Sequence, residues 1–215
     1  MEELQLNSKE TLAENEDCSD ISLRLQDEND IDDMMKWATD DKVSKFCSWS
    51  TYTSRQEAID YMANTVAPHP WWRAICVNNR AIGSISVTPF QGNDVCRGEL
   101  GYVLASSYWG RGIVTRAVKM VVQMVFAEWP HLERLEALVD VDNVGSQKVM
   151  EKAGFMREGV LRKGFVNSWA LHSFVESYIF AGGVSTLENW GIFFLRSQRL
   201  DGEEPTKFTT NDSRK

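Results

Sequence analysis

The first third of the chain alternates between strand-like and helix-like segments. Apolar and polar residues alternate over Ile21–Leu25, which predicts a strand. Asp30 is placed to cap a helix whose apolar face would consist of Ile31, Met34, Met35 and Ala38. Ser54 and Glu57 have the spacing of a capping box, because each can bind the other's unpaired backbone donor, and they predict a helix to about Thr65.

A β-hairpin is predicted next. Trp71–Val77 and Ala81–Val87 are rich in β-forming residues, and Asn78-Asn79-Arg80 separates them. Because asparagine tolerates positive φ, this spacer suits a tight turn between two antiparallel strands. Glu99–Ala105 predicts a third strand of the same sheet.

A long helix and a second group of strands are predicted after Gly112. The helix has an apolar stripe, and Pro130 would end it; the stripe consists of Val114, Ala117, Val118, Val121, Val122 and Val125. Leu135–Val139 alternates as a strand, Asn143 would cap a short helix ending at Gly154, and Phe155 would begin another strand. Strands interspersed with helices predict an α/β or α+β fold.

Composition narrows the class of protein. The length of 215 residues suits one domain, and a net charge of −8 disfavours a nucleic acid partner. Acidity either helps attract a cationic amine or only keeps the protein soluble. Four scattered cysteines and three histidines show no ligand spacing, so we expect no metal site. The chain has no run of about 18 apolar residues, so we expect no membrane span. We expect a monomer or weak homodimer in the cytoplasm or nucleus, without a secretory signal.

Three regions are predicted along the chain. Residues 1–20 are acidic and polar without a period, so we expect a disordered lead-in. Residues 21–183 would form the domain, and 184–215 a divergent and largely flexible tail, of which the polar segment Asp201–Lys215 would be disordered.

The strongest chemical signal is the segment that runs from Trp109 through Gly110, Arg111, Gly112, Ile113 and Val114 to Thr115. Two glycines allow the backbone to turn tightly and to approach a ligand closely. The loop enters a helix N-terminus, where unpaired N–H groups favour an anion such as phosphate. The pattern alone equally suits a tight turn that serves only packing.

Two other phosphate motifs fit less well. A dinucleotide fingerprint needs a third glycine where Thr115 stands, which argues against a nucleotide-dependent oxidoreductase. A nucleotide P-loop needs a Gly-Lys-Ser/Thr sequence, and the chain has none.

The segment Tyr108–Val114 resembles the acyl-CoA pyrophosphate motif of GNAT N-acetyltransferases, in the form found in the branch that modifies ribosomal proteins. The leading Gln/Arg of that motif is replaced by Ser107. Three further segments resemble the family in order: Glu99–Leu104, Asn143–Ser146, and Glu151–Phe155 with Glu158-Gly159 after it. The resemblance covers about residues 21–166. Beyond them the usual aspartate is absent, although Phe174–Phe180 could supply a substitute final strand.

The resemblance implies a mixed, splayed sheet of six or seven strands with helices on both faces. It implies that acetyl-CoA enters the gap between the fourth and fifth strands. Pantetheine would then lie along Tyr102, Val103 and Leu104, and Asn143 would contact it. Pyrophosphate would bind the amides of Trp109, Gly110, Arg111, Gly112, Ile113 and Val114 and the hydroxyl of Thr115.

The implied reaction is transfer of acetyl from acetyl-CoA to an amine. An ammonium must first lose a proton, and Glu99 is the first candidate for the base, although it could be only a charge at a strand edge. Ser146 is either a proton donor to the leaving thiolate or only a residue of the first helical turn. The alternative to an enzyme is a regulatory domain that binds acyl-CoA with little or no turnover.

The sequence does not name the acceptor. A protein N-terminus, a lysine side chain, a polyamine or another small amine all fit, and the branch resemblance favours a protein α-amine only slightly. Five aromatic residues lie in segments that wall the amine site in the family, although most of them also suit a core: Trp37, Trp49, Tyr52, Trp71 and Trp72.

Overall fold

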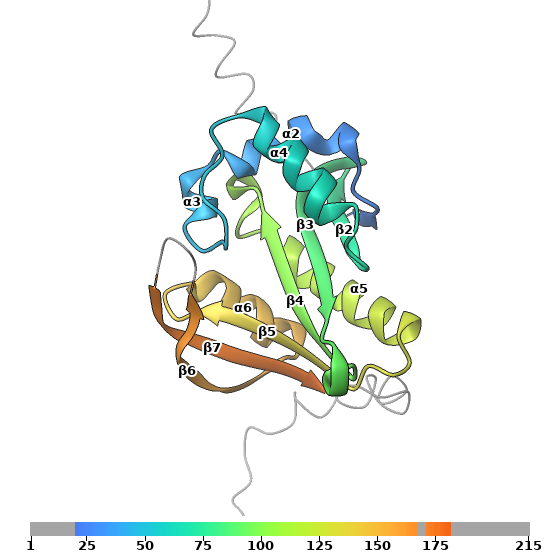
Figure 1. Ribbon diagram of the computed structural model, residues 1–215, viewed down its shortest axis with the longest axis vertical. Coiled ribbons are helices and arrows are strands. Elements are labelled where there is room, and N and C mark those ends of the chain that lie inside the picture. The colour runs from blue at the N-terminus through green and yellow to red at the C-terminus, as the bar shows by residue number, and fades with distance from the viewer. Residues whose placement is uncertain (1–19, 167–170, 182–215) are drawn as a thin grey trace, which may run out of the picture.

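Seven strands form one mixed sheet in the order β1-β2-β3-β4-β5-β7-β6 (Figure 1). The structure is a computed structural model, and it describes residues 20–166 and 171–181. The strands are β1 (Ile21–Arg24), β2 (Trp72–Val77), β3 (Arg80–Pro89), β4 (Arg97–Leu104), β5 (Arg134–Asp140), β6 (Met156–Val166) and β7 (Leu171–Ala181). The α-helices are α2 (Ile31–Ala38), α3 (Asp41–Ser44), α4 (Arg55–Tyr61), α5 (Ile113–Glu128) and α6 (Val144–Ala153). This mixed sheet with helices on both faces confirms the predicted fold class.

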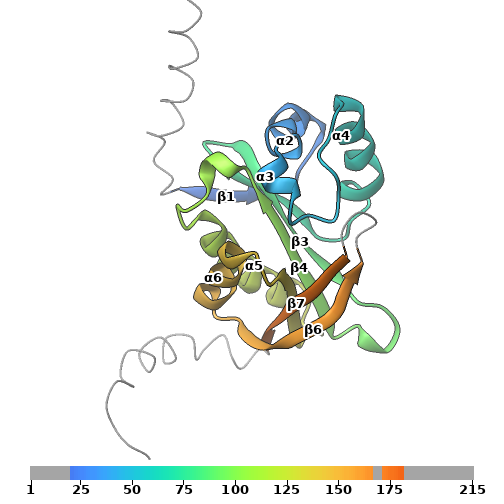
Figure 2. The same cartoon turned by 90° about the vertical axis from the view of Figure 1, so that its left-hand side faces the viewer.

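Helices cover both faces of the sheet (Figure 2). The strand β2 has apolar residues on both of its faces, so both need to be covered. Ala74 and Cys76 pack with α2 and α4 on one face, and Ile75 and Val77 pack with α5 on the other. All six residues of the predicted α5 stripe are buried on the α5 side of the sheet, in one cluster with Ile75 and Val77. α6 packs beside α5. Within the described ranges, no helix is long and apolar enough to cross a bilayer.

Several local predictions are confirmed. Asn78 and Asn79 have φ of 50° and 61° and connect β2 to β3. Ser54 and Glu57 form the predicted capping box at the start of α4. α4 is followed by a single π-helical turn over Met62–Val66, so the helical segment ends close to the predicted Thr65. The substitute final strand is also present, because β7 pairs with β5 on one side and β6 on the other.

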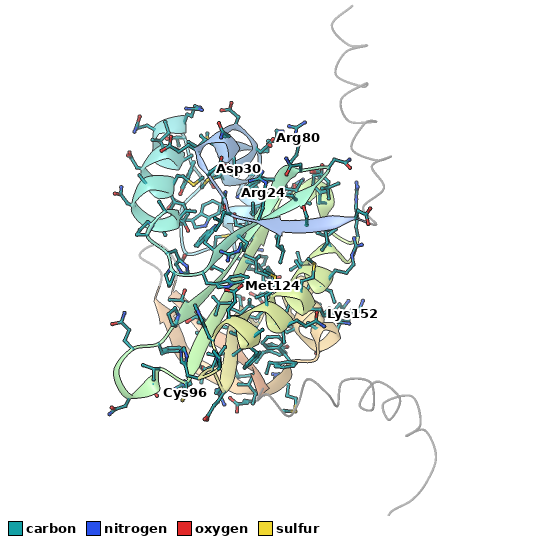
Figure 3. The ribbon with its side chains drawn as sticks, turned by 90° about the vertical axis from the view of Figure 1, so that its right-hand side faces the viewer. Arg24, Asp30, Arg80, Cys96, Met124 and Lys152 are labelled. Atoms are coloured by element: carbon teal, nitrogen blue, oxygen red, sulfur yellow. The ribbon has the colours of Figure 1, made fainter. Side chains whose placement is uncertain are left out.

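The prediction that Asp30 caps α2 is wrong. Its side chain makes no cap hydrogen bond to that helix. It accepts two hydrogen bonds from the Arg24 guanidinium, at 2.6 and 2.8 Å, and one from the backbone N–H of Asp27 (Figure 3). Asp27 in turn caps the short 3-10 turn Glu28–Asp30 that leads into α2. The buried face of α2 also includes Trp37, which the predicted stripe omitted.

The most consequential feature of the sheet is that β4 and β5 part soon after they meet. They run parallel and share only three register pairs, Arg97–Arg134, Gly98–Leu135 and Glu99–Glu136. Beyond these, β4 continues to Leu104 and β5 to Asp140 without pairing with each other, and Figure 1 shows the two strands diverging. The backbone of β4 that faces the gap is therefore not paired with β5 beyond Glu99.

β3 supports β4 on its other side. The two strands pair from Pro89–Gly98 to Gly83–Leu104. At Gly83 they lie so close that an added Cβ would be 2.3 Å from the Val103 carbonyl oxygen. Glycine is therefore required there by space rather than by φ.

The predicted lead-in 1–20, except for Asp20, and the predicted tail 184–215 lie outside the described residues.

We expect Asp30→Ala to lower the free energy of unfolding by about 2 kcal/mol, because it leaves the half-buried Arg24 without its carboxylate. Asp32→Ala is the control, since Asp32 forms an ion pair with Arg55 on the surface and its side chain is 81% exposed. Such pairs contribute about 0–1 kcal/mol. Urea denaturation of both variants measures the difference, and equal losses would contradict a special role for Asp30.

Candidate active site

The gap between β4 and β5 opens into two cavities. We call the first, of about 540 Å³, the loop-side cavity, because the glycine loop and the starts of α5 and α6 line it together with the end of β4. We call the second, of about 320 Å³, the aromatic cavity, because its wall includes Trp37, Phe46, Trp49, Tyr61, Trp72 and Tyr102. Both volumes lie within the range of sites for small molecules.

The glycine loop has the conformation that its sequence predicts. Gly110 and Gly112 have φ of 77° and 72°, a region that residues with a Cβ rarely adopt. The helix α5 begins directly after Gly112, and no side chain caps it. The first intrahelical bond runs from the Arg116 N–H to the Gly112 carbonyl, so the amides of residues 113–115 have no acceptor in the helix.

Several charges and dipoles at the loop-side cavity favour an anion. The uncapped start of α5 points its N–H groups there. Lys148 and Lys152 of α6 line the same cavity. The Arg111 guanidinium lies over the ring of Tyr108, 5.3 Å from its centroid, next to the loop. Thr115 lines the cavity, whereas the side chains of Ile113 and Val114 are mostly in the core.

The β4 residues predicted to contact pantetheine line this gap. Tyr102 and Val103 line both cavities, and Leu104 lines the loop-side cavity. Trp109, which is 48% exposed, folds back and donates its indole N–H to the Leu104 carbonyl at 2.8 Å. Trp109 therefore occupies one of the β4 carbonyls that a ligand along this edge would use.

α6 brings Asn143 and Ser146 to the boundary between the cavities. The Asn143 side chain accepts a hydrogen bond from the Ser146 N–H at 3.1 Å, so the predicted cap of this helix is confirmed. Both residues line both cavities. Across the gap, the Tyr102 hydroxyl lies 3.5 Å from the Ser146 carbonyl oxygen, and burial raises the pKa of Tyr102 to about 12.

Glu99 lies in the wall of the aromatic cavity, at the point where the strands part. Its register partners are Thr88 on β3 and Glu136 on β5. Burial raises the pKa of Glu99, and the charge of Glu136 raises it further. In the part of the chain that the structure describes, the Glu99 carboxylate has no hydrogen bond or ion pair.

Glu136, by contrast, is paired with two cations. The Arg97 and Arg134 guanidinium groups donate to the same carboxylate oxygen, each through Nε, at 2.6 and 2.8 Å. Although burial acts in the opposite direction, these bonds hold the pKa of Glu136 below its usual range. Each arginine also forms a second ion pair, Arg97 with Asp94 and Arg134 with Glu158. The two neighbouring carboxylates thus have opposite environments, one neutralised and one not.

Gln26, which follows β1 and lines the aromatic cavity, was not predicted as a site residue. Its amide oxygen accepts hydrogen bonds from the Trp72 indole and the Ser84 hydroxyl, both at 2.7 Å. Because the indole nitrogen can only donate, this orientation of the amide is fixed. Its Nε2 is buried, and no partner for it lies among the described residues.

The predicted aromatic wall is correct in part. Trp37, Trp49 and Trp72 line the aromatic cavity. Tyr52 lies behind it, in ring contact with Trp49. Trp71 belongs to the core on the opposite face of the sheet, where its indole N–H binds Glu128 at 2.7 Å. Phe46 and Tyr61 complete the wall and were not predicted.

Comparison with known proteins agrees with this geometry. A probable N-acetyltransferase of Bacillus subtilis, YjcK, is 41% identical over 86 residues, which are 40% of this chain and 47% of the relative. The match thus spans about half of that relative's length.

Two solved structures share the fold. One is the microcin C7 self-immunity acetyltransferase MccE in complex with acetyl-CoA and AMP, with a TM-score of 0.67, 18% identity, and 76% and 93% of the two chains covered. The other is RimL, a ribosomal L7/L12 α-N-protein acetyltransferase in complex with coenzyme A, with a TM-score of 0.64, 20% identity, and 76% and 94% covered.

The family assignment rests on a match to more than half of the chain. Residues 20–156 match the model of the acetyltransferase (GNAT) domain. This range contains the glycine loop, the parted strands and the start of α6 described above. The chain belongs to the GNAT acetyltransferase family.

Proposed function

We propose that this protein transfers the acetyl group of acetyl-CoA to a primary amine, with a protein N-terminal α-amine as the favoured acceptor. The observation that carries the proposal is that two cavities meet at the open edge of β4. Tyr102, Val103, Asn143 and Ser146 line both. A thioester that extends from the loop-side cavity would therefore meet an amine in the aromatic cavity.

The residues of the loop-side cavity fit acetyl-CoA. The uncapped amides at the start of α5 suit pyrophosphate, and Lys148 and Lys152 add positive charge. The open β4 edge at Tyr102–Leu104 offers backbone groups to the amides of pantetheine once Trp109 releases the Leu104 carbonyl. The acetyl-CoA and coenzyme A complexes of MccE and RimL support this use of the fold.

The proposed reaction begins with deprotonation. Glu99 accepts a proton from the ammonium, directly or through water, because its carboxylate is not engaged with a cation. The neutral nitrogen then attacks the thioester carbonyl, so that the C–N bond forms as the C–S bond breaks. The Ser146 hydroxyl at the cavity boundary gives its proton to the leaving thiolate and takes up the second proton of the nitrogen, so that coenzyme A leaves as the free thiol.

The preference for a protein α-amine rests on likeness to RimL and on the resemblance of the glycine loop to the ribosomal-protein branch. We propose that the protein acts in the cytoplasm. We propose that it is a monomer or a weak homodimer. Release of free thiol in the presence of an amine distinguishes this enzyme from a domain that only binds acyl-CoA.

We expect acetyl-CoA to raise the melting temperature, because a ligand that binds only the folded state stabilises it. At 100 times Kd the stabilisation is about 2.7 kcal/mol. Differential scanning fluorimetry with acetyl-CoA, coenzyme A and NAD measures the effect. A shift with NAD alone, or no shift at millimolar acetyl-CoA, would contradict the proposal.

We expect Gly110→Ala to weaken binding of acetyl-CoA about tenfold, or ~1.4 kcal/mol, because a loop that relaxes away from φ of 77° must be strained again on binding. Gly92→Ala is the matched control. Gly92 has φ of 70°, lies between β3 and β4, and like Gly110 has open space around a built Cβ. Calorimetry should show weaker binding only for the Gly110 variant, with similar stability losses in both.

We expect Glu99→Gln to lower turnover about 10²-fold at pH 7, with a smaller defect at high pH where the amine is already neutral. The thermal stability of the variant, by contrast, should increase at pH 7. The pKa of Glu99 is raised in the folded state, so the wild type loses stability as pH rises through that pKa. The glutamine variant should therefore melt higher than wild type at pH 7, and the gap should close near pH 4. A defect independent of pH would exclude the base role.

A further inference from the structure

The aromatic cavity is walled by rings that hold one another in place. Trp49 contacts Tyr52 at 5.3 Å between centroids, Tyr52 contacts Tyr61 at 6.4 Å, and Tyr61 contacts Trp72 at 6.0 Å. The last two contacts are edge-to-face, so each ring fixes the plane of the next. Trp49, Tyr61 and Trp72 are half-buried and line the cavity, so they keep ring surface for a ligand.

Such a wall selects ligands by two properties. Flat apolar bodies gain most from contact with fixed ring surfaces. An ammonium group is attracted to the face of an aromatic ring, most strongly to tryptophan and when water is excluded. The cavity of about 320 Å³ is near the lower end of the range for ligand sites, which suits a body of about one or two rings.

The charges that line the cavity are few and of one sign. Glu99 and Asp140 are the acidic residues of its described lining, and that lining contains no lysine or arginine. Asp140 also accepts the backbone N–H of Asp142 at 2.7 Å. A carboxylate on the acceptor would therefore meet Glu99 without a cation to balance it, and a polyamine would bring more positive charges than the cavity can pair.

We propose that the acceptor is a monoamine whose ammonium is carried on an aromatic or bulky apolar body that bears no acidic group. This inference rests on the proposed acetyl transfer and names the chemistry of its acceptor. Two sources share that chemistry, a free arylalkylamine and the first residue of a peptide with a large apolar side chain. In both, the body lies among Trp49, Tyr61 and Trp72, and the nitrogen lies towards Glu99.

The first experiment compares kcat/KM across a panel of amines by thiol release, with the full-length protein and acetyl-CoA. Phenethylamine is compared with propylamine, which lacks the ring, with phenylalanine, which adds a carboxylate, and with spermidine, which adds charges. We expect phenethylamine to exceed each of the other three about tenfold or more. Peptides that begin with Phe or with Gly form the second arm and separate the two sources.

The second experiment tests the wall itself. We expect Trp49→Leu and Tyr61→Leu to reduce the ratio of phenethylamine to propylamine towards one, and Trp49→Phe to restore most of it. Trp129→Leu is the matched control. Trp129 is a half-buried tryptophan at the end of α5 that stacks on His131 and lines neither cavity. Because the readout is a ratio, a partial loss of folded protein does not move it.

Each outcome decides the proposal. A preference for phenethylamine, for the Phe peptide or for both supports it, provided that the wall variants erase the preference. Equal or better use of propylamine, phenylalanine, spermidine or the Gly peptide overturns it, as does turnover of other amines without turnover of any aromatic monoamine. Failure of the proposed function looks different, since no amine of any kind would then release thiol, whether or not acetyl-CoA raises the melting temperature.

Discussion

The short parallel pairing of β4 with β5 is the constraint on which the site depends. Three register pairs hold the strands together, and the ion pair of Arg97 on β4 with Glu136 on β5 joins them, while Arg134 pairs with Glu136 along β5. If the pairing continued, β5 would cover the edge of β4, and no gap would remain between the two strands for the cavities to meet. If it were absent, α6 would not bring Ser146 opposite Tyr102. The Arg97–Glu136 ion pair thus lies in the closed part of the sheet, directly before the strands part.

The same corner of the sheet holds two carboxylates that differ in their partners. Glu136 is neutralised by two guanidinium groups, whereas the half-buried Glu99 carboxylate lies next to an open cavity and has no cation partner among the described residues. A protein optimised only for stability would not leave a carboxylate in that state. Pairs of acidic groups whose environments push their pKa values apart are typical of acid–base sites.

Features that depend on neighbours in the sequence could be predicted. The Asn78-Asn79 turn, the capping box of Ser54 and Glu57, and the conformation of Gly110 and Gly112 all follow from residues within a few positions. Features that depend on distant partners could not. Gln26 acquires its place from Trp72 and Ser84, 46 and 58 residues away, and Glu136 from Arg97, 39 residues away.

Adjacent residues show the same limit. Trp71 and Trp72 have the same side chain, and the sequence placed both as candidates for the aromatic wall. Strand alternation sends Trp71 to the core under α5 and Trp72 to the cavity. Asp30 was predicted to cap α2 because its residue type and position suit a cap, but the guanidinium of Arg24 takes its carboxylate instead. Alternation places the two tryptophans on opposite faces, but tertiary contacts decide which face is the core under α5 and which partner Asp30 takes.

The close approach at Gly83 has an evolutionary consequence. Gly83 takes no part in the proposed chemistry, yet any larger residue would press on the Val103 carbonyl and move the edge along which the thioester would lie. Every substitution there adds at least a Cβ, so no gradual series of small changes leads away from glycine. Relatives that retain the function should therefore keep glycine at this position, as a marker of groove shape rather than of catalysis.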